Sequence, residues 1–178
     1  MRFSKWLLNL LGWKTDNVQL DVPKCVIALA PHTSNWDFVI GKLAYSSLGR
    51  KAYFLIKKEW FFFPFDIFFR SIGGISTNRS THSSMTDKMA EEFRNRDRFQ
   101  LAITPEGTRK ANSEWKKGFY YIALKANVPI LMVGLDYKTK HALWLGLFTP
   151  TGDYDTDIVK IKSYYKDLLG KHPKQFSL

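Results

Sequence analysis

The sequence is poor in cysteine and lacks long hydrophobic runs, and each shortage excludes a class of protein. A single cysteine, Cys25, stands among 178 residues, so no internal disulfide can form and a reducing, cytoplasmic setting is expected. The longest apolar runs, 60–65 and 142–148, are far shorter than the ~20 residues that a transmembrane helix needs. No small-residue cleavage site follows an apolar N-terminal stretch. We therefore expect neither a membrane-spanning helix nor a secretory signal.

Acidic residues are also scarce. The chain has 16 Asp and Glu against 27 Lys and Arg, which gives a formal net charge of +11. Such a positive field attracts phosphate-bearing partners, whether nucleic acid, anionic lipid or phosphorylated small molecules, and charge alone does not decide among them. Hydrophobic residues make up 45% of the chain, and this content at this length predicts one domain with a core of its own.

The first helical pattern lies at the N-terminus. Five apolar residues recur at the spacing of one helical stripe: Phe3, Trp6, Leu7, Leu10 and Leu11. They predict a short amphipathic helix over 1–14, ahead of a single domain over 15–178. An apolar stripe that carries tryptophan and is flanked by cations suits a helix lying among lipid headgroups, but a helix packed on the core would show the same pattern.

Beyond residue 15, apolar runs of strand length alternate with helical patterns. Strands are predicted over 25–30, 52–56, 75–77, 99–104, 129–135 and 141–147. Helices are predicted over 35–48, 59–71, 80–96, 117–126 and 155–169. This alternation indicates an α/β fold: a mostly parallel sheet flanked by helices, with the last strands pairing antiparallel at an edge. Ligands in such folds collect beyond the carboxyl ends of the strands.

A histidine and an aspartate follow the first predicted core strand. His32 comes two residues after the run 25–30, and Asp37 follows it five residues later. A carboxylate that holds one imidazole nitrogen fixes the tautomer and leaves the other nitrogen as a base for an alcohol proton. A capping role for His32, with Asp37 as a solvated acid in the first helical turn, explains the same spacing.

A second polar cluster follows the strand 99–104. It consists of Glu106, Gly107, Thr108 and Arg109. The glycine allows a tight backbone, the threonine offers a hydroxyl, and the arginine offers a planar fork that can grip a phosphate, with Glu106 placed to orient it. By itself, such a string also fits an ordinary surface loop with an incidental ion pair.

A third cluster surrounds the short strand 75–77. Gly73 and Gly74 precede the strand, and Arg79 follows it. Arg79 is thus a second candidate phosphate clamp. A turn followed by a solvated arginine is the ordinary alternative.

Aromatic residues are concentrated between residues 60 and 69. The segment holds Trp60, Phe61, Phe62, Phe63, Phe65, Phe68 and Phe69. In a helix these rings would spread around the whole circumference, so one buried face cannot take them all. We expect the first five of them to include side chains that face lipid or line an acyl groove, with nearby cations meeting anionic headgroups. An aromatic-rich core helix would account for only part of the set.

Read in chain order, the three clusters resemble the glycerolipid acyltransferase family, typified by the 1-acylglycerol-3-phosphate acyltransferases. The resemblance covers roughly residues 25–135 and includes the His-x4-Asp pair, the glycine-to-arginine cluster, Glu-Gly-Thr-Arg, and the strand start at 128–130. Lys58-Glu59, Pro64 and Lys117-Gly118 also fall where that family keeps similar residues.

The resemblance implies an acyl transfer in phospholipid biosynthesis. His32 would be the general base, oriented by Asp37, and the acceptor hydroxyl would attack the thioester of acyl-CoA or acyl-carrier protein directly, without an acyl-enzyme. Arg79 and Arg109 would hold the phosphate or other anionic headgroup of a lysophospholipid-like acceptor, in a pocket shaped by residues 106–108. No cofactor or metal is implied. Contact with an anionic membrane would be peripheral, on its cytoplasmic face.

Two departures from the family pattern matter for the acceptor. Pro31 stands where many members have asparagine, and Asn78 stands where an acidic residue is common. Because Asn78 changes the charge beside a presumed phosphate clamp, the headgroup is less defined than the reaction. A non-glycerol aminolipid acceptor therefore stays open, as does a thioesterase that uses His32 on water.

A nucleic-acid-binding module is the alternative from a different class, suggested by the net charge and the aromatic content. Stacking platforms interleave single aromatics with Arg or Lys, whereas here the aromatics are clustered, so this alternative is disfavoured. Cys25 opens an apolar strand and is expected to be a buried structural thiol. The remaining histidines, His82, His141 and His172, lack metal-ligand spacing and are assigned to the surface or the core.

Overall fold

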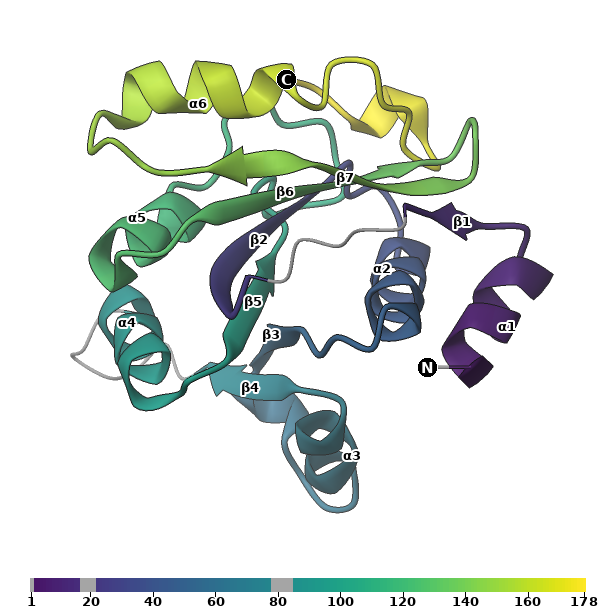
Figure 1. The fold of residues 1–178 in the computed structure, drawn as a ribbon, viewed down its shortest axis with the longest axis horizontal. Helices are drawn as coiled ribbons and strands as arrows, with labels where there is room; N and C mark the ends of the chain where they lie inside the picture. The colour runs from purple at the N-terminus through teal and green to yellow at the C-terminus, as the bar shows by residue number, and fades with distance from the viewer. Residues whose placement is uncertain (1, 17–21, 78–84) are drawn as a thin grey trace.

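Seven strands form one sheet in a computed structural model that describes residues 2–16, 22–77 and 85–178 (Figure 1). The strands are β1 (Lys14–Thr15), β2 (Lys24–Ala30), β3 (Tyr53–Lys57), β4 (Gly74–Thr77), β5 (Phe99–Ile103), β6 (Ile130–Asp136) and β7 (His141–Phe148). The helices are α1 (Arg2–Leu10), α2 (Trp36–Ser47), α3 (Phe65–Ser71), α4 (Met85–Asn95), α5 (Gly118–Ala126) and α6 (Tyr154–Ser163). Two 3-10 turns, η1 (Lys58–Trp60) and η2 (Pro173–Gln175), complete the described elements.

The strand order is β1-β7-β6-β2-β5-β3-β4, and only β6 and β7 pair antiparallel within the described sheet. The predicted α/β fold with a mostly parallel sheet is therefore confirmed, as is the antiparallel pairing of the last two long strands. Strand β1 was not predicted, because two residues without an apolar pattern give no strand signal. It pairs with β7, so the antiparallel pair does not form the edge of the sheet.

Three helix predictions differ from the structure at their ends. The helix predicted over 1–14 ends at Leu10, because the chain turns there to enter β1. The helix predicted over 59–71 is broken into η1 and α3, since Pro64 cannot continue a helix that precedes it. The closing helix predicted over 155–169 ends at Ser163. The predicted start of the helix 80–96 lies outside the described residues.

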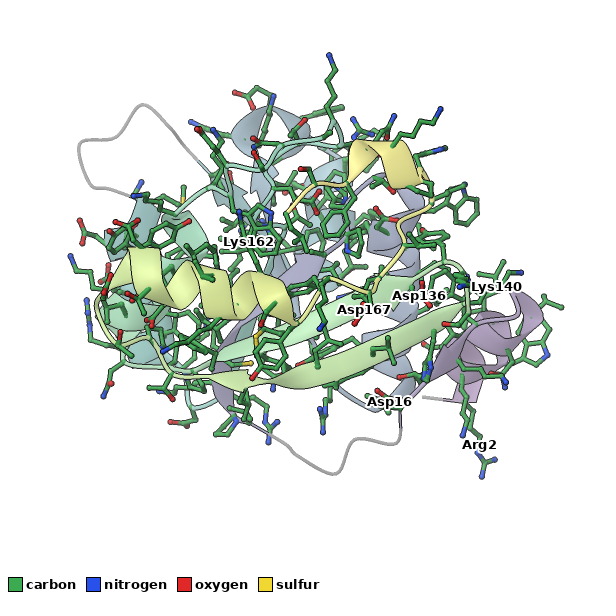
Figure 2. All side chains as sticks on the ribbon, turned by 90° about the horizontal axis from the view of Figure 1, so that it is seen from above. Arg2, Asp16, Asp136, Lys140, Lys162 and Asp167 are labelled. Carbon is green, nitrogen blue, oxygen red and sulfur yellow. The ribbon has the colours of Figure 1, made fainter. Side chains whose placement is uncertain are left out.

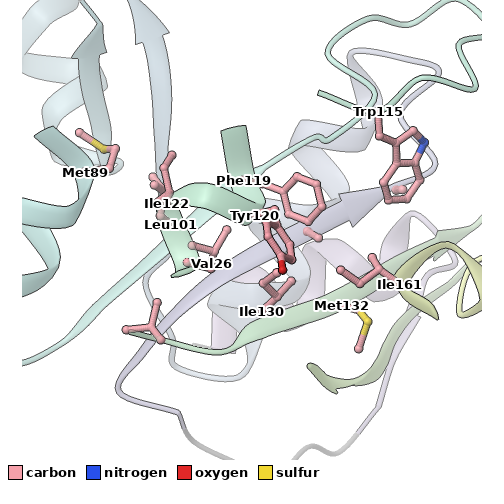
Figure 3. Packing of buried hydrophobic residues seen from close by; sticks show 14 of the residues in the cluster. Val26, Met89, Leu101, Trp115, Phe119, Tyr120, Ile122, Ile130, Met132 and Ile161 are labelled. Carbon is pink, nitrogen blue, oxygen red and sulfur yellow. The ribbon is translucent and has the colours of Figure 1, made fainter. Parts of the chain in front are cut away.

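Alternate residues of the central strand β2 face two different helical layers. Val26, Ala28 and Ala30 belong to the main core, together with side chains from α4, α5 and α6 (Figure 3). Cys25 and Ile27 point to the other face, which α1 and α2 cover. This period of two places one residue set of each strand in each layer, so the sheet is the middle of three layers.

The N-terminal helix presents its apolar stripe outward. Leu8 is 1% exposed and holds α1 against the molecule. Phe3, Trp6 and Leu10 are all more than half exposed. Three of the five residues of the predicted stripe therefore form an open apolar surface, whereas Leu8 is buried and Leu11, a stripe residue, packs partly buried against the same cluster.

Candidate active site

Two of the three polar clusters predicted from the sequence, those of His32 and Glu106, meet at one edge of the sheet. Strands β2 and β5 run parallel side by side, with Ala28 opposite Ile103. The loops that follow them, carrying His32 and Glu106, therefore leave the sheet at the same edge. Strand β6 lies on the other side of β2 in the same direction and brings Tyr137 to this edge as well.

His32 and Asp37 form a pair as the sequence predicts. His32 Nδ1 lies 3.2 Å from Asp37 Oδ2. Asp37 is fully buried, whereas the side chain of His32 keeps 20% of its surface exposed. With Nδ1 held by the carboxylate, Nε2 is the ring nitrogen left for chemistry.

Three further groups donate hydrogen bonds to the carboxylate of Asp37. The backbone N–H groups of Thr33 and Ser34 donate to Oδ2 at 2.7 and 2.8 Å. The hydroxyl of Tyr137 donates to Oδ1 at 2.5 Å. Burial alone would raise the pKa of Asp37, but these bonds and the one to His32 outweigh it and hold that pKa below its ordinary value. The carboxylate therefore stays ionised beside the imidazole.

No role for Tyr137 was predicted from the sequence, because the partner of its hydroxyl lies 100 residues away. One signal was available: Tyr137 follows directly on a buried parallel strand, as His32 and Glu106 nearly do. Burial, followed by the charge and hydrogen bond of Asp37, raises the pKa of Tyr137 well above its usual range. Tyr137 is thus a permanent hydrogen-bond donor to Asp37 rather than an acid–base group.

Glu106 points inward, away from the position that the sequence suggested. Its side chain is fully buried, and Oε1 accepts a hydrogen bond from the backbone N–H of His32 at 2.6 Å. Burial raises the pKa of this carboxyl to about 7, against the hydrogen bond from His32 and with the help of the charge on Asp37. Glu106 fixes the histidine loop, whereas we expected it to orient Arg109.

Arg109 reaches the histidine loop from the β5 side. Its Nη1 donates a hydrogen bond to Oδ1 of Asn35, the residue before α2. The tight backbone predicted at Gly107 is present: its φ of +66° lies in the left-handed region, and a Cβ there would stand 2.8 Å from the side chain of Lys116. Thr108 Oγ1 accepts from the N–H of Lys110 at 3.2 Å and closes the same turn.

Two adjoining cavities open beside His32. The first, of about 340 Å³, is lined by His32, Asn35 and Thr104 together with apolar side chains. The second, of about 60 Å³, lies deeper between α2 and the sheet and ends near Trp144. Four residues line both cavities: Leu29, Phe38, Phe54 and Ala102. An apolar path therefore leads from the imidazole into the layer beneath α2.

The aromatic segment lies away from these cavities, at the surface. Phe62, Phe63 and Phe65 are 54%, 80% and 47% exposed, and Phe61 is partly buried. The expectation that one core face cannot take all these rings is met, and the rings that line the two cavities belong to other residues: Phe38, Tyr45, Phe54 and Trp144. The side chain of Trp60 lies outside the description.

The other residues considered from the sequence fall as follows. Arg79 lies outside the described residues, as does His82. Cys25 is fully buried in the sheet, as expected for a structural thiol. His141 Nε2 lies 2.9 Å from Asp16 Oδ1 at the β1 edge of the sheet. His172 lines a third cavity, together with other residues of the C-terminal segment and of the loops after β2 and β5.

A family model described as Acyltransferase matches residues 15–136, which is more than half of the chain. The fold is similar to the crystal structure of PlsC, the 1-acyl-sn-glycerophosphate (LPA) acyltransferase from Thermotoga maritima, with a TM-score of 0.63. That similarity covers 91% of this chain and 73% of the other at 18% sequence identity, and at this identity it shows a shared fold. No curated protein sequence matches the chain. Together, family model and fold confirm the resemblance inferred from the motifs.

Proposed function

The chain belongs to the acyltransferase family, and we propose that it moves a fatty acyl group from an acyl thioester to the hydroxyl of a lysophospholipid-like acceptor in phospholipid biosynthesis. The observation that carries this proposal is the His32–Asp37 pair at the mouth of an apolar path. A base beside a slot for a hydrocarbon chain is the arrangement that acylation of an alcohol requires.

The reaction starts with the proton of the acceptor hydroxyl. His32 Nε2 takes this proton while the acceptor oxygen attacks the thioester carbonyl. The resulting tetrahedral intermediate expels the thiolate, and the imidazolium donates its proton to this thiolate. An ester and a free thiol then leave the site. Asp37 stays ionised throughout and stabilises the imidazolium that forms between the two steps. Base assistance of this kind contributes about 10² to 10⁴ in rate.

The acyl chain occupies the path from His32 towards Trp144. The walls of the deep cavity are almost entirely apolar. The small residues Gly41 and Ala44 on α2 leave space for the chain. The proposed donor is acyl-CoA or acyl-carrier protein. In the described residues, His, Cys, Asp and Glu do not gather in threes in a way that would hold a metal ion.

Arg109 binds the anionic headgroup of the acceptor, with Thr108 and the backbone of Gly107 shaping that side of the pocket. Arg79 is proposed as the second clamp. We expect Arg109→Ala to raise the KM for the acceptor more than the KM for the thioester, because only the acceptor carries its headgroup to this loop. Equal changes in the two KM values would remove Arg109 from the headgroup site.

The protein docks peripherally on an anionic membrane, on the cytoplasmic face. Among the described helices, none is both long and apolar enough to cross a bilayer. Two open apolar surfaces support docking: the stripe of α1 and the segment of Phe62, Phe63, Phe65 and Phe68. Arg2 points away from the molecule beside the first surface (Figure 2), and basic residues at 57, 58 and 70 border the second.

Vesicle sedimentation tests the docking surface. Replacing Phe62 and Phe63 together by serine should lower the partition coefficient onto anionic vesicles by about 10³-fold or more, because about 2–3 kcal/mol of burial in lipid is lost for each ring. Val159→Ser is the matched control, since Val159 is 68% exposed on α6, on a different part of the surface. Equal sedimentation of the double variant and the control would contradict docking through the phenylalanines.

Thiol release separates transfer from hydrolysis. The intact chain is incubated with acyl-CoA or acyl-carrier protein, with and without a lysophospholipid, and the lipid product is identified by mass spectrometry. Release that requires the acceptor supports transfer. Release at the same rate without it would make the protein a thioesterase, and acylation of an aminolipid but not a lysophospholipid would change the acceptor class.

A further inference from the structure

The C-terminal segment, residues 169–176, lies beyond the stretch that the acyltransferase family model matches, yet it contacts both loops of the candidate site. At its start, the N–H of Leu169 donates to Oδ1 of Asp136 at 3.2 Å, and its carbonyl accepts from the N–H of Tyr137 at 2.8 Å. Asp136 is labelled in Figure 2 beside this part of the chain. At its end, Phe176 packs against the main core. The segment is therefore anchored on both sides.

Thr33 is the residue of the histidine loop that the segment touches. Thr33 is 2% exposed, it follows His32 directly, and its N–H donates to Asp37. The backbone N–H of His172 donates to Thr33 Oγ1 at 3.2 Å. Gly170 lies so close that a Cβ on it would stand 2.7 Å from the methyl carbon of Thr33. The segment thus fixes the backbone that supplies a hydrogen bond to the catalytic carboxylate.

Gln175 joins the histidine loop to the arginine loop. Its side-chain amide faces two backbone carbonyl oxygens, which can only accept hydrogen bonds, so its nitrogen end is turned towards them. In that orientation it donates to the carbonyl of Arg109 at 2.9 Å and to the carbonyl of Thr33 at 3.1 Å. One side chain therefore links the loops that follow β2 and β5, from a position far along the chain from either.

The same three segments line a third, open cavity of about 540 Å³. Its walls include Asn35 and Trp36 from the start of α2, Arg109 and Lys110 from the arginine loop, and His172 and Gln175 from the C-terminal segment. Asn35 also lines the cavity that holds His32, so the two cavities are neighbours. Its charged walls are basic, which suits an anionic headgroup placed next to the reacting hydroxyl.

We propose that Gln175 is a positioning residue for the acceptor: it holds the backbone of Arg109 at a fixed distance from Thr33, so that the guanidinium and the imidazole face the two ends of one acceptor molecule. The argument rests on the proposed function and extends it to the C-terminal segment. Without the two hydrogen bonds, the loop after β5 keeps its tie from Glu106 to the N–H of His32, but the backbone of Arg109 is no longer held and its side chain reaches the histidine loop through Asn35. Acceptor binding then weakens, while the acyl path keeps its walls.

Steady-state kinetics of the intact chain test this role. The three substitutions introduce side chains that are similar in length to that of glutamine. Gln175→Met removes the donors and should lower kcat/KM for the acceptor on the order of tenfold. Gln175→Glu sets a carboxylate against two carbonyl oxygens and should lower it further. Gln175→Lys restores N–H donors and should recover most of the loss. The KM for the acyl thioester should stay unchanged in all three.

Lys174→Met and Lys174→Glu are the controls, because Lys174 is the exposed neighbour of Gln175 and these changes lower the charge beside the cavity by one and two units, at least as much as Gln175→Glu does. Kinetic constants close to those of the parent in both controls support the proposal. An equal effect of the Lys174 pair would show that charge near the cavity is responsible. The proposal would be overturned if the loss of kcat/KM in the Gln175 variants paralleled their loss of thermal stability. It would also be overturned if kcat/KM fell equally for the acyl donor and the acceptor.

Failure of this proposal is distinguishable from failure of the proposed function. If the parent protein acylates no lysophospholipid, the proposed function fails. If the parent transfers normally and the Gln175 variants match it, only the role of Gln175 fails.

Discussion

The two faces of the sheet are packed in opposite ways. The face under α4, α5 and α6 is filled by large buried side chains, among them Phe93, Phe119 and Tyr120 (Figure 3). The face under α1 and α2 carries the cavities, lined in part by small residues such as Gly41, Ala44 and Ala102. Both faces are built from the same strands, whose successive residues point to opposite sides.

The two faces of the sheet therefore contribute differently to stability and to activity. The filled face supplies the hydrophobic stabilisation, since dense packing around aromatic rings is where burial contributes most. The hollow face gives up part of that stabilisation and gains a path that starts at His32. Stability and activity are therefore expected to respond to substitutions on different faces, and each of the following experiments tests that separation.

The largest effect is expected at the mouth of the hollow face. His32→Ala should lower the transfer rate by about 10² to 10⁴, equivalent to about 3–5 kcal/mol of barrier, with unchanged thermal stability. His141→Ala is a matched control because it breaks the other described His–Asp contact, 2.9 Å to Asp16, on a strand that lies two places from β2 in the sheet order. Turnover within a few-fold of the parent for His32→Ala would refute the role of the base.

A nearly equal effect, on stability instead of rate, is expected on the filled face. Phe119→Ala should lower the free energy of unfolding by about 3–5 kcal/mol, because it leaves a cavity in a closed core. Denaturant titration measures the loss, and activity is compared per folded molecule. Tyr121→Ala, on the same helix but 41% exposed, should cost far less. Loss of specific activity in Phe119→Ala would show that the two faces are coupled.

Glu106, at the boundary between the faces, should make stability depend on pH. Because the folded state holds the pKa of this carboxyl at about 7, above its unfolded value, the stabilisation is complete below about pH 4.5 and is lost as the pH rises to about 7. The full loss is about 3–4 kcal/mol. Glu106→Gln cannot titrate, so it should gain stability relative to the parent across this window.

Denaturation at about pH 5 and about pH 8 measures this difference, with Glu114→Gln as the exposed control in the following loop. A stability difference between Glu106→Gln and the parent that stays constant with pH would mean that the carboxyl titrates normally in the folded protein.

The smallest effect is expected inside the hollow face. Gly41→Ala places a methyl group 3.4 Å from Leu29, at ordinary contact distance, and should raise stability by up to about 1 kcal/mol because alanine favours a helix interior. The same methyl group narrows the acyl path, so long-chain thioesters should lose about tenfold in kcat/KM relative to short ones. Gly118→Ala, where a Cβ would meet nothing within 4 Å, should leave chain-length preference unchanged.

Local patterns in the sequence predicted most of the fold and the pair of His32 and Asp37. The strand 25–30 is an apolar run between prolines, and it reappears as β2 over Lys24–Ala30. His32 and Asp37 are five residues apart on one turn, so their contact depends on local geometry alone. The same holds for Gly107, whose backbone conformation is a property of one tight loop.

Contacts between distant segments could not be predicted in this way. Strand β1 exists because β7 is there to pair with it, not because Lys14 and Thr15 favour a strand. The inward turn of Glu106 depends on an N–H offered by His32, 74 residues away. Tyr137 and Gln175 depend on the order of the strands and on the path of the C-terminal segment, neither of which a pattern in one stretch of sequence contains.

The contact between Trp13 and Tyr137 has a practical consequence for anyone shortening this protein. The two rings meet edge to face with centroids 4.8 Å apart, and Trp13 is 4% exposed. Deleting the apolar N-terminal residues through Trp13 to ease purification would expose one side of the ring of Tyr137, whose hydroxyl donates a hydrogen bond to Asp37. Low activity of a truncated enzyme would then reflect a disturbed active site as much as weaker binding to lipid. Substitutions at Phe3 and Trp6 are therefore the cleaner way to remove the apolar surface of the first helix.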